Sequence, residues 1–224
     1  MAIRAVKAQT AENQFNNLLV TMGLNVDEAV GKAIAALLHS NSHMVAGVME
    51  SAVAIQELEL KLDQAVFSAL EQGDLPRSEV SRLTSIVNIN KDLTRLGKLA
   101  ANLGRKVTEV GKHHEHEDFS RLQPLAIAVS HLCRQTLRSL TRQDLLLARS
   151  AAAAGASVDA YRDYVLRNLN GHQQSAASEQ DDLHLIFASR CLEQIADHAI
   201  HLAESLVDFL SSEHEPEQSH SMAS

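Results

Sequence analysis

The chain has 224 residues, of which 45% are hydrophobic and only 3% aromatic, and its formal net charge is -8. This length suits one large domain or two small ones, and the apolar content is sufficient for a sizeable core. The negative charge argues against nucleic acid as the main partner, because neutralising phosphates requires clustered Lys and Arg side chains.

The first half of the chain carries three helical patterns. Apolar residues at spacings of three and four predict helices over 15–37, 55–69 and 86–107. Asn41–Ser42 is a capping sequence for the second helix, and Pro76 sets the first turn of the third. Only three Pro and nine Gly interrupt the whole chain, which favours long helices.

The second half repeats this organisation after a polar join at 111–118, which reads Gly-Lys-His-His-Glu-His-Glu-Asp. Asp144 is positioned to cap a fifth helix, 171–178 has the composition of a turn, and a sixth helix is predicted over 185–209. Residues 211–224 are polar and predict a disordered tail. No segment alternates with period two, so we expect no sheet.

An internal repeat relates the two halves at an offset of 99 residues. The matched apolar positions are Leu93 with Leu192, Leu96 with Ile195, Ala100 with Ala199, and Leu103 with Leu202. The sequence therefore predicts an all-α fold of two tandem three-helix bundles, six helices in all, related by a pseudo-twofold. We expect one bundle over 1–112, the second over 113–210, and a tail over 211–224.

The two copies differ on the helix face opposite the apolar positions. Glu193 and Asp197 lie one helical turn apart there, and His201 follows one turn later. Two such carboxylates can chelate a cation if further ligands converge from a neighbouring helix, where Asp159 is a candidate. An imidazole from His201 would favour a transition metal over Mg. The alternative is that these residues form the solvated face of an amphipathic helix.

The first copy has Thr94 and Lys98 at the corresponding positions. We expect no metal there, because an ammonium repels a divalent cation in any dielectric. Arg95, Lys98, Arg105 and Lys106 make the outer face of this helix basic where its twin is acidic. Such a face serves either solubility or docking of an acidic partner or phosphate.

The polar join contains a second group of possible metal ligands. It consists of His113, His114, Glu115, His116, Glu117 and Asp118. Adjacent spacing does not suit one helical face, so the alternatives are a solvated linker and a metal site. The chain has no GxxxxGK[ST] loop, GxSxG elbow or HExxH motif, so no motif supports catalysis.

The expected compartment follows from the cysteines and the N-terminus. Cys133 and Cys191 are the only cysteines, which does not make a disulfide framework and favours a reducing environment. Residues 1–7 are followed by polar residues and not by an apolar run, so no signal peptide is visible. No apolar run approaches the length of a membrane span. We expect a soluble cytoplasmic protein that does not insert directly into a membrane.

Several segments resemble one family. The segment 192–204, Leu-Glu-Gln-Ile-Ala-Asp-His-Ala-Ile-His-Leu-Ala-Glu, is similar to the third-helix signature of PhoU proteins, which are accessory regulators of bacterial phosphate uptake. Further resemblances cover the first helix (22–29), the turns into the second helix (36–41 and 139–144) and the second-helix motif (56–59 and 158–161). Together they span nearly the whole chain and include the repeat.

The resemblance implies a metal motif of the form Glu/Asp-x-x-x-Asp in each repeat. Glu193 and Asp197 match it, whereas Thr94 and Lys98 do not. Gln194 also replaces the usual Arg of the motif. The first site is therefore expected to be degenerate, and the second to bind a divalent or transition metal such as Mg, Mn, Zn or Fe.

The family implies a function that residue spacing alone does not. The expected protein is a non-enzymatic negative regulator of phosphate uptake and phosphate-starvation signalling. It would act as a metal-binding adaptor between a phosphate ABC transporter and a sensor histidine kinase, and as a homodimer. The alternatives are a metal-dependent enzyme of unknown substrate and a regulatory helical-bundle module of a sodium–phosphate cotransport system.

Overall fold

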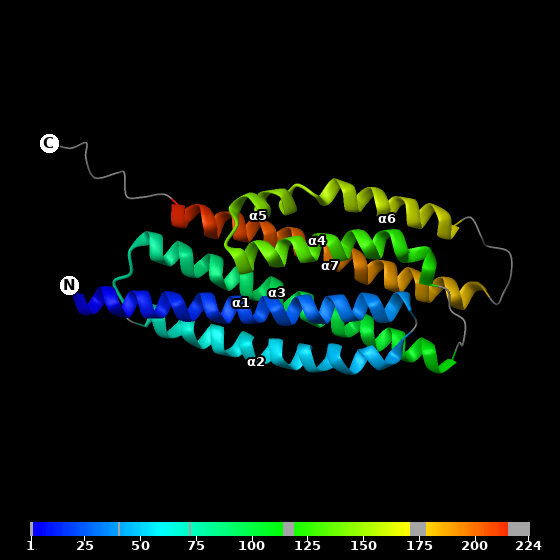
Figure 1. Cartoon of the computed structure of the whole chain (residues 1–224), viewed down its shortest axis with the longest axis horizontal. Helices are drawn as coiled ribbons and strands as arrows, with labels where there is room; N and C mark the ends of the chain where they lie inside the picture. The colour runs from blue at the N-terminus through cyan, green and yellow to red at the C-terminus, as the bar shows by residue number, and fades with distance from the viewer. Residues whose placement is uncertain (1, 40, 72, 114–118, 171–177, 215–224) are drawn as a thin grey trace.

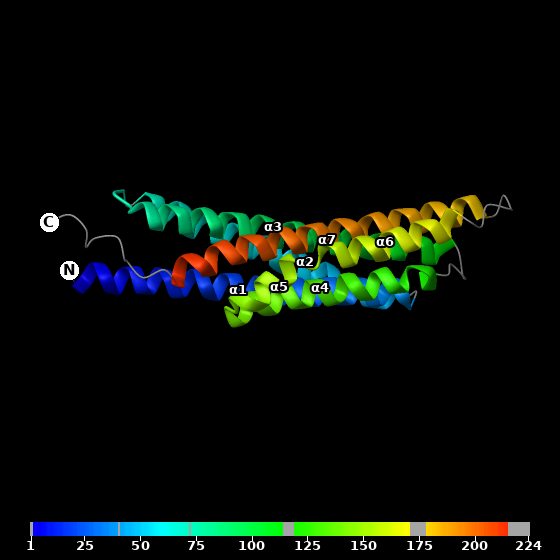
Figure 2. The same cartoon turned by 90° about the horizontal axis from the view of Figure 1, so that it is seen from above.

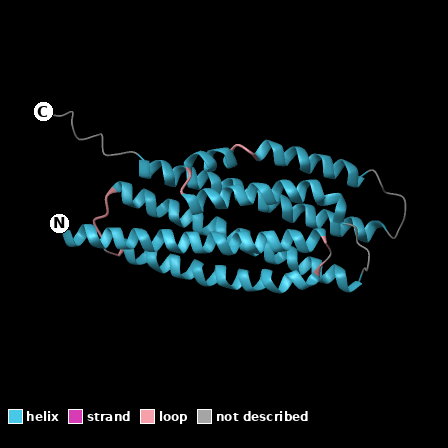
Figure 3. Cartoon of the chain, in the orientation of Figure 1, coloured by secondary structure: helices cyan, strands magenta, loops and turns pink. Residues whose placement is uncertain are grey.

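The computed structural model describes residues 2–39, 41–71, 73–113, 119–170 and 178–214. Within these ranges the chain is helical and contains no strand (Figure 3), as predicted. The helices are α1 (Ala2–Leu38), α2 (Val45–Leu70), α3 (Arg77–His113), α4 (Gln123–Arg142), α5 (Leu145–Ala152), α6 (Gly155–Asn170) and α7 (Ser178–His214), with short 3₁₀ turns at Ser42–Met44 and Phe119–Leu122. None of these helices combines the length and apolarity needed to cross a bilayer.

The helices form two bundles that lie side by side along one long axis (Figure 1). In the first bundle α1, α2 and α3 pack against one another, and in the second α4, α5 and α6 pack around α7. The bundles meet along α3 and α7, with α1 also against α4. The view from above shows α3 and α7 crossing near the middle of the molecule (Figure 2).

The repeated apolar positions form the core of both bundles. Leu93 and Leu192 are fully buried, so the prediction that both face inward is confirmed. The other three matched pairs are buried as well. Their spacing of three and four keeps one stripe of each helix against its neighbours, which is the packing that the sequence pattern predicted.

One of the two expected capping sequences begins its α-helix directly. Asp144 Oδ1 accepts a hydrogen bond from the Leu147 amide at 3.0 Å and caps α5 as expected. Asn41 Oδ1 accepts one from the His43 amide at 3.0 Å, but this caps the short 3₁₀ turn Ser42–Met44, and α2 begins after Met44 without a side-chain cap. Gly73 and Asp74 both adopt positive φ in the turn that precedes α3, a conformation that glycine adopts without strain. Pro76 stands directly before α3.

Several element boundaries differ from the prediction. The expected fifth helix is divided into α5 and α6 by a turn at Ala153 and Ala154. Gly155 begins α6 with its Cα close to α7, where a Cβ would meet the Ile200 side chain at 3.2 Å. A glycine therefore permits the close approach that the turn creates.

The helices α3 and α7 also continue into segments that were predicted to be a linker and a tail. Residues 111–113 belong to α3 and 211–214 belong to α7. Glycine and polar residues are tolerated in a helix, at a cost of about 1 kcal/mol for glycine, and no proline intervenes before Pro216. The rest of the predicted join (114–118), turn (171–177) and tail (215–224) lies outside the described residues.

Candidate functional site

The candidate metal face is on α7, on the side of the helix opposite the core. Leu192 and Ile195 are fully buried, whereas Asp197 is exposed and Glu193 is half-buried. The carboxylates therefore leave the apolar seam intact and point away from it. The structure places this pair as the helical spacing predicted.

Residues of α6 approach this face from the neighbouring helix. Arg162 binds Asp159, with 2.9 Å between Nη1 and Oδ1, and also binds Asp163, with 3.1 Å between Nη2 and Oδ1. Asp159 was a predicted further ligand, and it is close enough to influence the ionisation of Glu193. No sequence pattern predicted Arg162 at this face, because its position beside Glu193 depends on how α6 packs.

The electrostatics of Glu193 reflect a partly buried carboxylate among charges of both signs. Desolvation by burial raises the pKa of Glu193, and the charges of Arg162 and Arg190 act in the opposite direction. Asp197 and Asp159 add to the rise, because neighbouring negative charges disfavour ionisation. A cation at this face would relieve the repulsion among the three carboxylates.

His201 lies one turn further along the same helix but has its own contacts. Its side chain is 65% exposed, and Nδ1 lies 3.4 Å from Glu204 Oε2. Its ring is tilted against that of His198, with 6.2 Å between the centroids. No group of three or more His, Cys, Asp or Glu residues within the described ranges is already arranged to hold a metal ion. The acidic oxygens at α6 and α7 nevertheless suit an oxygen-preferring cation, with Arg162 as its competitor.

The corresponding face of the first repeat is neutralised by its own residues. Lys98 Nζ on α3 lies 3.8 Å from Glu59 Oε2 on α2. The Asn90 amide donates a hydrogen bond of 2.8 Å to Asp63 Oδ1 of α2. Thr94 is buried, and its hydroxyl has no hydrogen-bonding partner within the described part of the chain. An ammonium therefore stands where the second repeat has Asp197.

Three of the four residues of the predicted basic face lie together. Arg95, Lys98 and Arg105 line a groove of about 360 Å³ between α2 and α3, which we call the α2–α3 groove. Its other lining residues are Met49, Ala52, Val53, Gln56, Ala101 and Asn102. Lys106 is separate from these, since its Nζ lies 5.2 Å from the centroid of the Phe187 ring and 3.1 Å from Glu109 Oε2.

A polar contact between the two repeats was not found by sequence reasoning. His198 Nδ1 on α7 lies 3.1 Å from Asp92 Oδ1 on α3. The two residues are 106 positions apart. His198 belongs to the segment that resembles the family signature, but only the packing of α3 on α7 supplies its partner.

The cysteines and the His-rich group are the remaining candidate functional groups of the sequence. Cys133 and Cys191 are buried and free, and burial raises the pKa of the Cys133 thiol to about 12. In the His-rich group, His113 ends α3 and the remaining five residues lie outside the described ranges.

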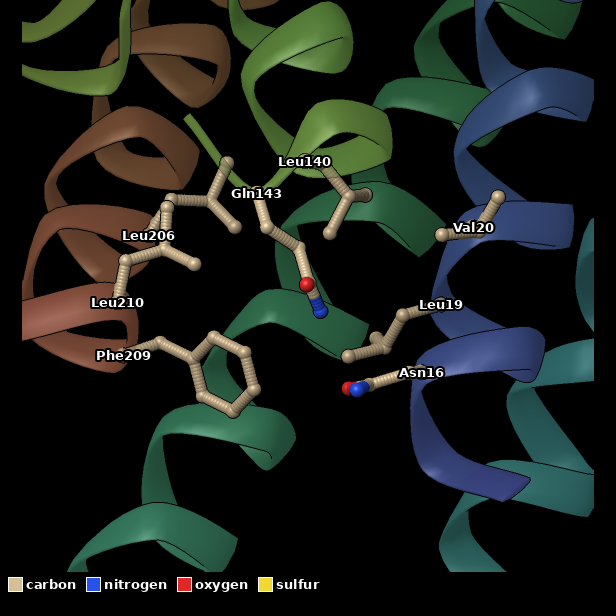
Figure 4. Close-up of a pocket in the computed structure, with 8 residues that line it drawn as sticks. All are labelled: Asn16, Leu19, Val20, Leu140, Gln143, Leu206, Phe209 and Leu210. Carbon is tan, nitrogen blue, oxygen red and sulfur yellow. The ribbon is translucent and has the colours of Figure 1, made fainter. Parts of the chain in front are cut away.

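A small cavity lies where α1, α4 and α7 meet (Figure 4). The side-chain amides of Asn16 and Gln143 point toward one another among apolar side chains, which include Leu206 and Phe209. The cavity has a volume of about 10 Å³, which is room for one water molecule. It is too small for a substrate or cofactor.

Comparison with known proteins places this arrangement in a family. The family model described as the PhoU domain matches residues 19–107 and 125–206, which correspond to the two bundles. The chain is 26% identical over 191 residues to a phosphate-specific transport system accessory protein PhoU homologue of Pseudomonas putida, covering 84% of this chain and 75% of that protein. The homologue of Pseudomonas aeruginosa is also 26% identical, covering 84% of this chain and 79% of that protein.

Solved structures agree with this assignment. The crystal structure of PhoU from Pseudomonas aeruginosa matches with a TM-score of 0.82 and 25% identity, covering 91% of this chain and 98% of that one. The phosphate transport system regulatory protein PhoU from Streptococcus pneumoniae shares the fold, with a TM-score of 0.75, 19% identity, and coverage of 89% and 94%. The two matched domains, the buried repeat seams and these structures together show that the chain belongs to the PhoU family.

Proposed function

We propose that this protein is a non-enzymatic accessory regulator of phosphate uptake, which represses phosphate-starvation signalling when phosphate is plentiful. The names of its relatives support a role beside a phosphate transport system. The family membership supports transfer of that role to this chain. We further propose that the protein acts in the cytoplasm as a homodimer, as an adaptor between a phosphate ABC transporter and a sensor histidine kinase.

The acidic face of the second repeat is the proposed regulatory metal site. Glu193 and Asp197 on α7 would hold the cation with Asp159 of α6, and His201 would contribute from the next turn. The cation would supply positive charge between α6 and α7. The observation that carries the proposal is that Asp159 of α6 lies within electrostatic reach of Glu193 on α7, so that acidic residues of two neighbouring helices act on one another.

The contrast between the repeats supports a single metal site. In the first repeat the charge between α2 and α3 is balanced within the protein by the ion pair of Lys98 with Glu59. In the second repeat Arg162 forms ion pairs with Asp159 and Asp163 from a partly exposed position on α6, and Arg190 adds a second positive charge near Glu193. A cation of higher charge would compete with Arg162 for the same carboxylates.

The experiment combines two substitutions at the proposed site. Glu193→Gln with Asp197→Asn removes both charges and keeps the shapes of the side chains. We expect bound metal per chain, measured after loading with Mn²⁺ or Zn²⁺, to fall to background. Helical content by circular dichroism should not change, because both residues lie off the apolar seam.

A phosphate-response reporter in cells then tests the regulatory role. The double variant should lose repression in high phosphate if the site acts in signalling. A matched variant, Glu59→Gln with Asp63→Asn on α2, removes two acids from the first repeat and should leave metal content unchanged. Unchanged metal in the α7 variant would contradict the ligand assignment, and lost metal with normal repression would contradict the role of the site.

A further inference from the structure

An unusual apolar stripe runs along the outer surface of α2, a helix that packs on α1 and α3 at the edge of the molecule (Figure 1). Val53, Leu60 and Phe67 are exposed by 56%, 63% and 63%, respectively. Spacings of seven residues place them on one face of the helix over about 21 Å. Single exposed apolar residues are ordinary, but three large ones in a row mark an interaction site. We call these three residues the α2 stripe.

A row of cations runs along the outer face of the adjacent α3. Lys91, Arg95, Lys98 and Arg105 follow one another at spacings of four, three and seven, so they share a helix face. Within the described ranges, neither Lys91 nor Arg95 has an ion-pair or hydrogen-bonding partner, and Lys98 meets Glu59 only at 3.8 Å. This α3 row is conspicuous in a chain whose net charge is -8.

The stripe and the row border the same depression. Val53 at one end of the stripe and Arg95, Lys98 and Arg105 of the row all line the α2–α3 groove. The groove therefore has an apolar wall on α2 and a basic wall on α3. Two roughly antiparallel helices with an open seam between them offer the site into which a third helix packs.

We propose that this surface docks an amphipathic helix of a partner protein, whose apolar face covers the α2 stripe and whose acidic flank pairs with the α3 row. Charge complementarity selects the partner, because its acids would meet four cations along one side. The proposal adds a docking surface to the adaptor role and rests on that role. It requires no metal at Glu193 and Asp197, so the two proposals can fail separately.

Other occupants fit these walls less well. A small anion such as inorganic phosphate would satisfy the cations but leave Leu60 and Phe67 exposed to water. A second copy packed through the α2 stripe about a twofold axis would bring two α3 rows of the same sign toward each other. An acidic helix covers both features at once.

The test uses a synthetic 21-residue helical peptide with Leu at the a and d positions of three heptads and Glu at e and g. A fluorescent label reports its binding to the full-length protein by anisotropy, with EDTA present. Saturable binding is expected, with a dissociation constant that rises as salt is added. The same peptide with Lys in place of Glu should bind at least about tenfold more weakly.

Two variants of the protein locate the binding surface. Arg95→Glu with Lys98→Glu should weaken binding of the Glu peptide about tenfold or more and strengthen binding of the Lys peptide. Leu60→Gln with Phe67→Gln should weaken the binding of both peptides. Both of these side chains are exposed, so this variant still tests the proposal if the charge variant folds poorly. The matched control, Arg134→Glu with Arg138→Glu on the exposed face of α4, should bind as wild type.

Three results would overturn the proposal. The first is absence of saturable binding of the Glu peptide to the wild-type protein. The second is displacement of the peptide by 5 mM inorganic phosphate at constant ionic strength, which would make the groove a small-anion site. The third is conversion of a dimer to a monomer by Leu60→Gln with Phe67→Gln, because the stripe would then be covered by a second copy.

Discussion

At the scale of single residues, the charge balance between α6 and α7 decides whether the acidic face accepts a cation. Arg162 holds Asp159 and Asp163 and also stabilises the ionised form of Glu193. It thus performs within the protein the neutralisation that a bound cation would perform. The sequence predicted the acids by their spacing on one helix, but it held no signal for an arginine contributed by another helix.

Removing this competitor should strengthen metal binding. Arg162→Gln deletes the charge and leaves a shorter polar side chain. Because an exposed ion pair contributes about 0.2–1 kcal/mol, we expect about 1.4- to fivefold tighter binding of Mn²⁺, measured by isothermal titration calorimetry. Arg134→Gln, which removes an exposed charge from α4, is the control. Equal affinity of wild type and Arg162→Gln would show that Arg162 does not compete for the site.

The raised pKa of Glu193 has a consequence for stability. Burial disfavours the ionised carboxylate in the folded state, so the folded protein is less stable once pH rises above the ordinary range of a glutamate. In EDTA at pH 7, Glu193→Gln should therefore raise the melting temperature, on the order of 1–2 °C. The gain should shrink as pH falls toward 4, because wild-type Glu193 then becomes neutral as well.

Thermal unfolding by circular dichroism at several pH values measures this difference. Glu204→Gln provides a control on the same helix, since the Glu204 side chain is well exposed. A gain at pH 7 that persists unchanged at pH 4 would point to packing of the glutamine rather than to removal of a charge. A loss of stability at pH 7 would mean that Arg162 and Arg190 outweigh the cost of burial.

At the scale of helices, close packing depends on glycines whose role the sequence left undefined. Gly97 on α3 faces α2, where an added Cβ would meet Ile55 Cδ1 at 2.8 Å. Gly31 on α1 has no heavy atom within 4 Å of the corresponding position. Both were only interruptions of a helical pattern in the sequence. The tertiary structure distinguishes them, because contact with a second helix is not encoded in local spacing.

Alanine substitutions at these two glycines should therefore have opposite effects. Gly97→Ala should lower the free energy of unfolding by about 1–2 kcal/mol, because overpacking outweighs the better helix propensity of alanine. Gly31→Ala should raise it by about 0.5–1 kcal/mol. Urea denaturation measures both, and adding Ile55→Val to Gly97→Ala should recover part of the loss. The same sign for both substitutions would contradict the packing of α3 on α2.

At the scale of the whole molecule, contact between α3 and α7 joins the two repeats into one unit. These helices contribute the central seams of their bundles and pack against each other along the middle of the molecule (Figure 2). Asp92 and His198 add a polar contact across the same boundary. A shared interface of this kind favours cooperative unfolding of both bundles together.

The tyrosines allow this cooperativity to be measured without a label. Tyr161 and Tyr164 are the only tyrosines, both lie on α6 of the second repeat, and the chain has no Trp. Urea unfolding followed by tyrosine fluorescence should coincide with unfolding followed by circular dichroism, which reports both bundles. Separate midpoints would show that the repeats unfold independently. As a further check, Asp92→Asn should lower both midpoints together.

The sequence by itself determined the features that depend on local spacing. The absence of period-two patterns predicted a fold built from helices, and the 99-residue offset predicted the matched core positions such as Leu93 and Leu192. Asp144 capped its helix as expected, because a cap needs only the amide three residues later. The placement of Glu193 and Asp197 on one face also followed directly from 3.6 residues per turn.

Only the tertiary structure decided which residues distant in the chain became neighbours. It brought Arg162 and Asp159 to Glu193, Glu59 to Lys98, and the basic row of α3 beside the apolar stripe of α2. It also divided the predicted fifth helix into α5 and α6. Periodicity specifies which side of a helix is apolar, but it does not specify which helix will lie against the polar side. That choice arises from the packing of all the helices together, and it determines the charge of each face.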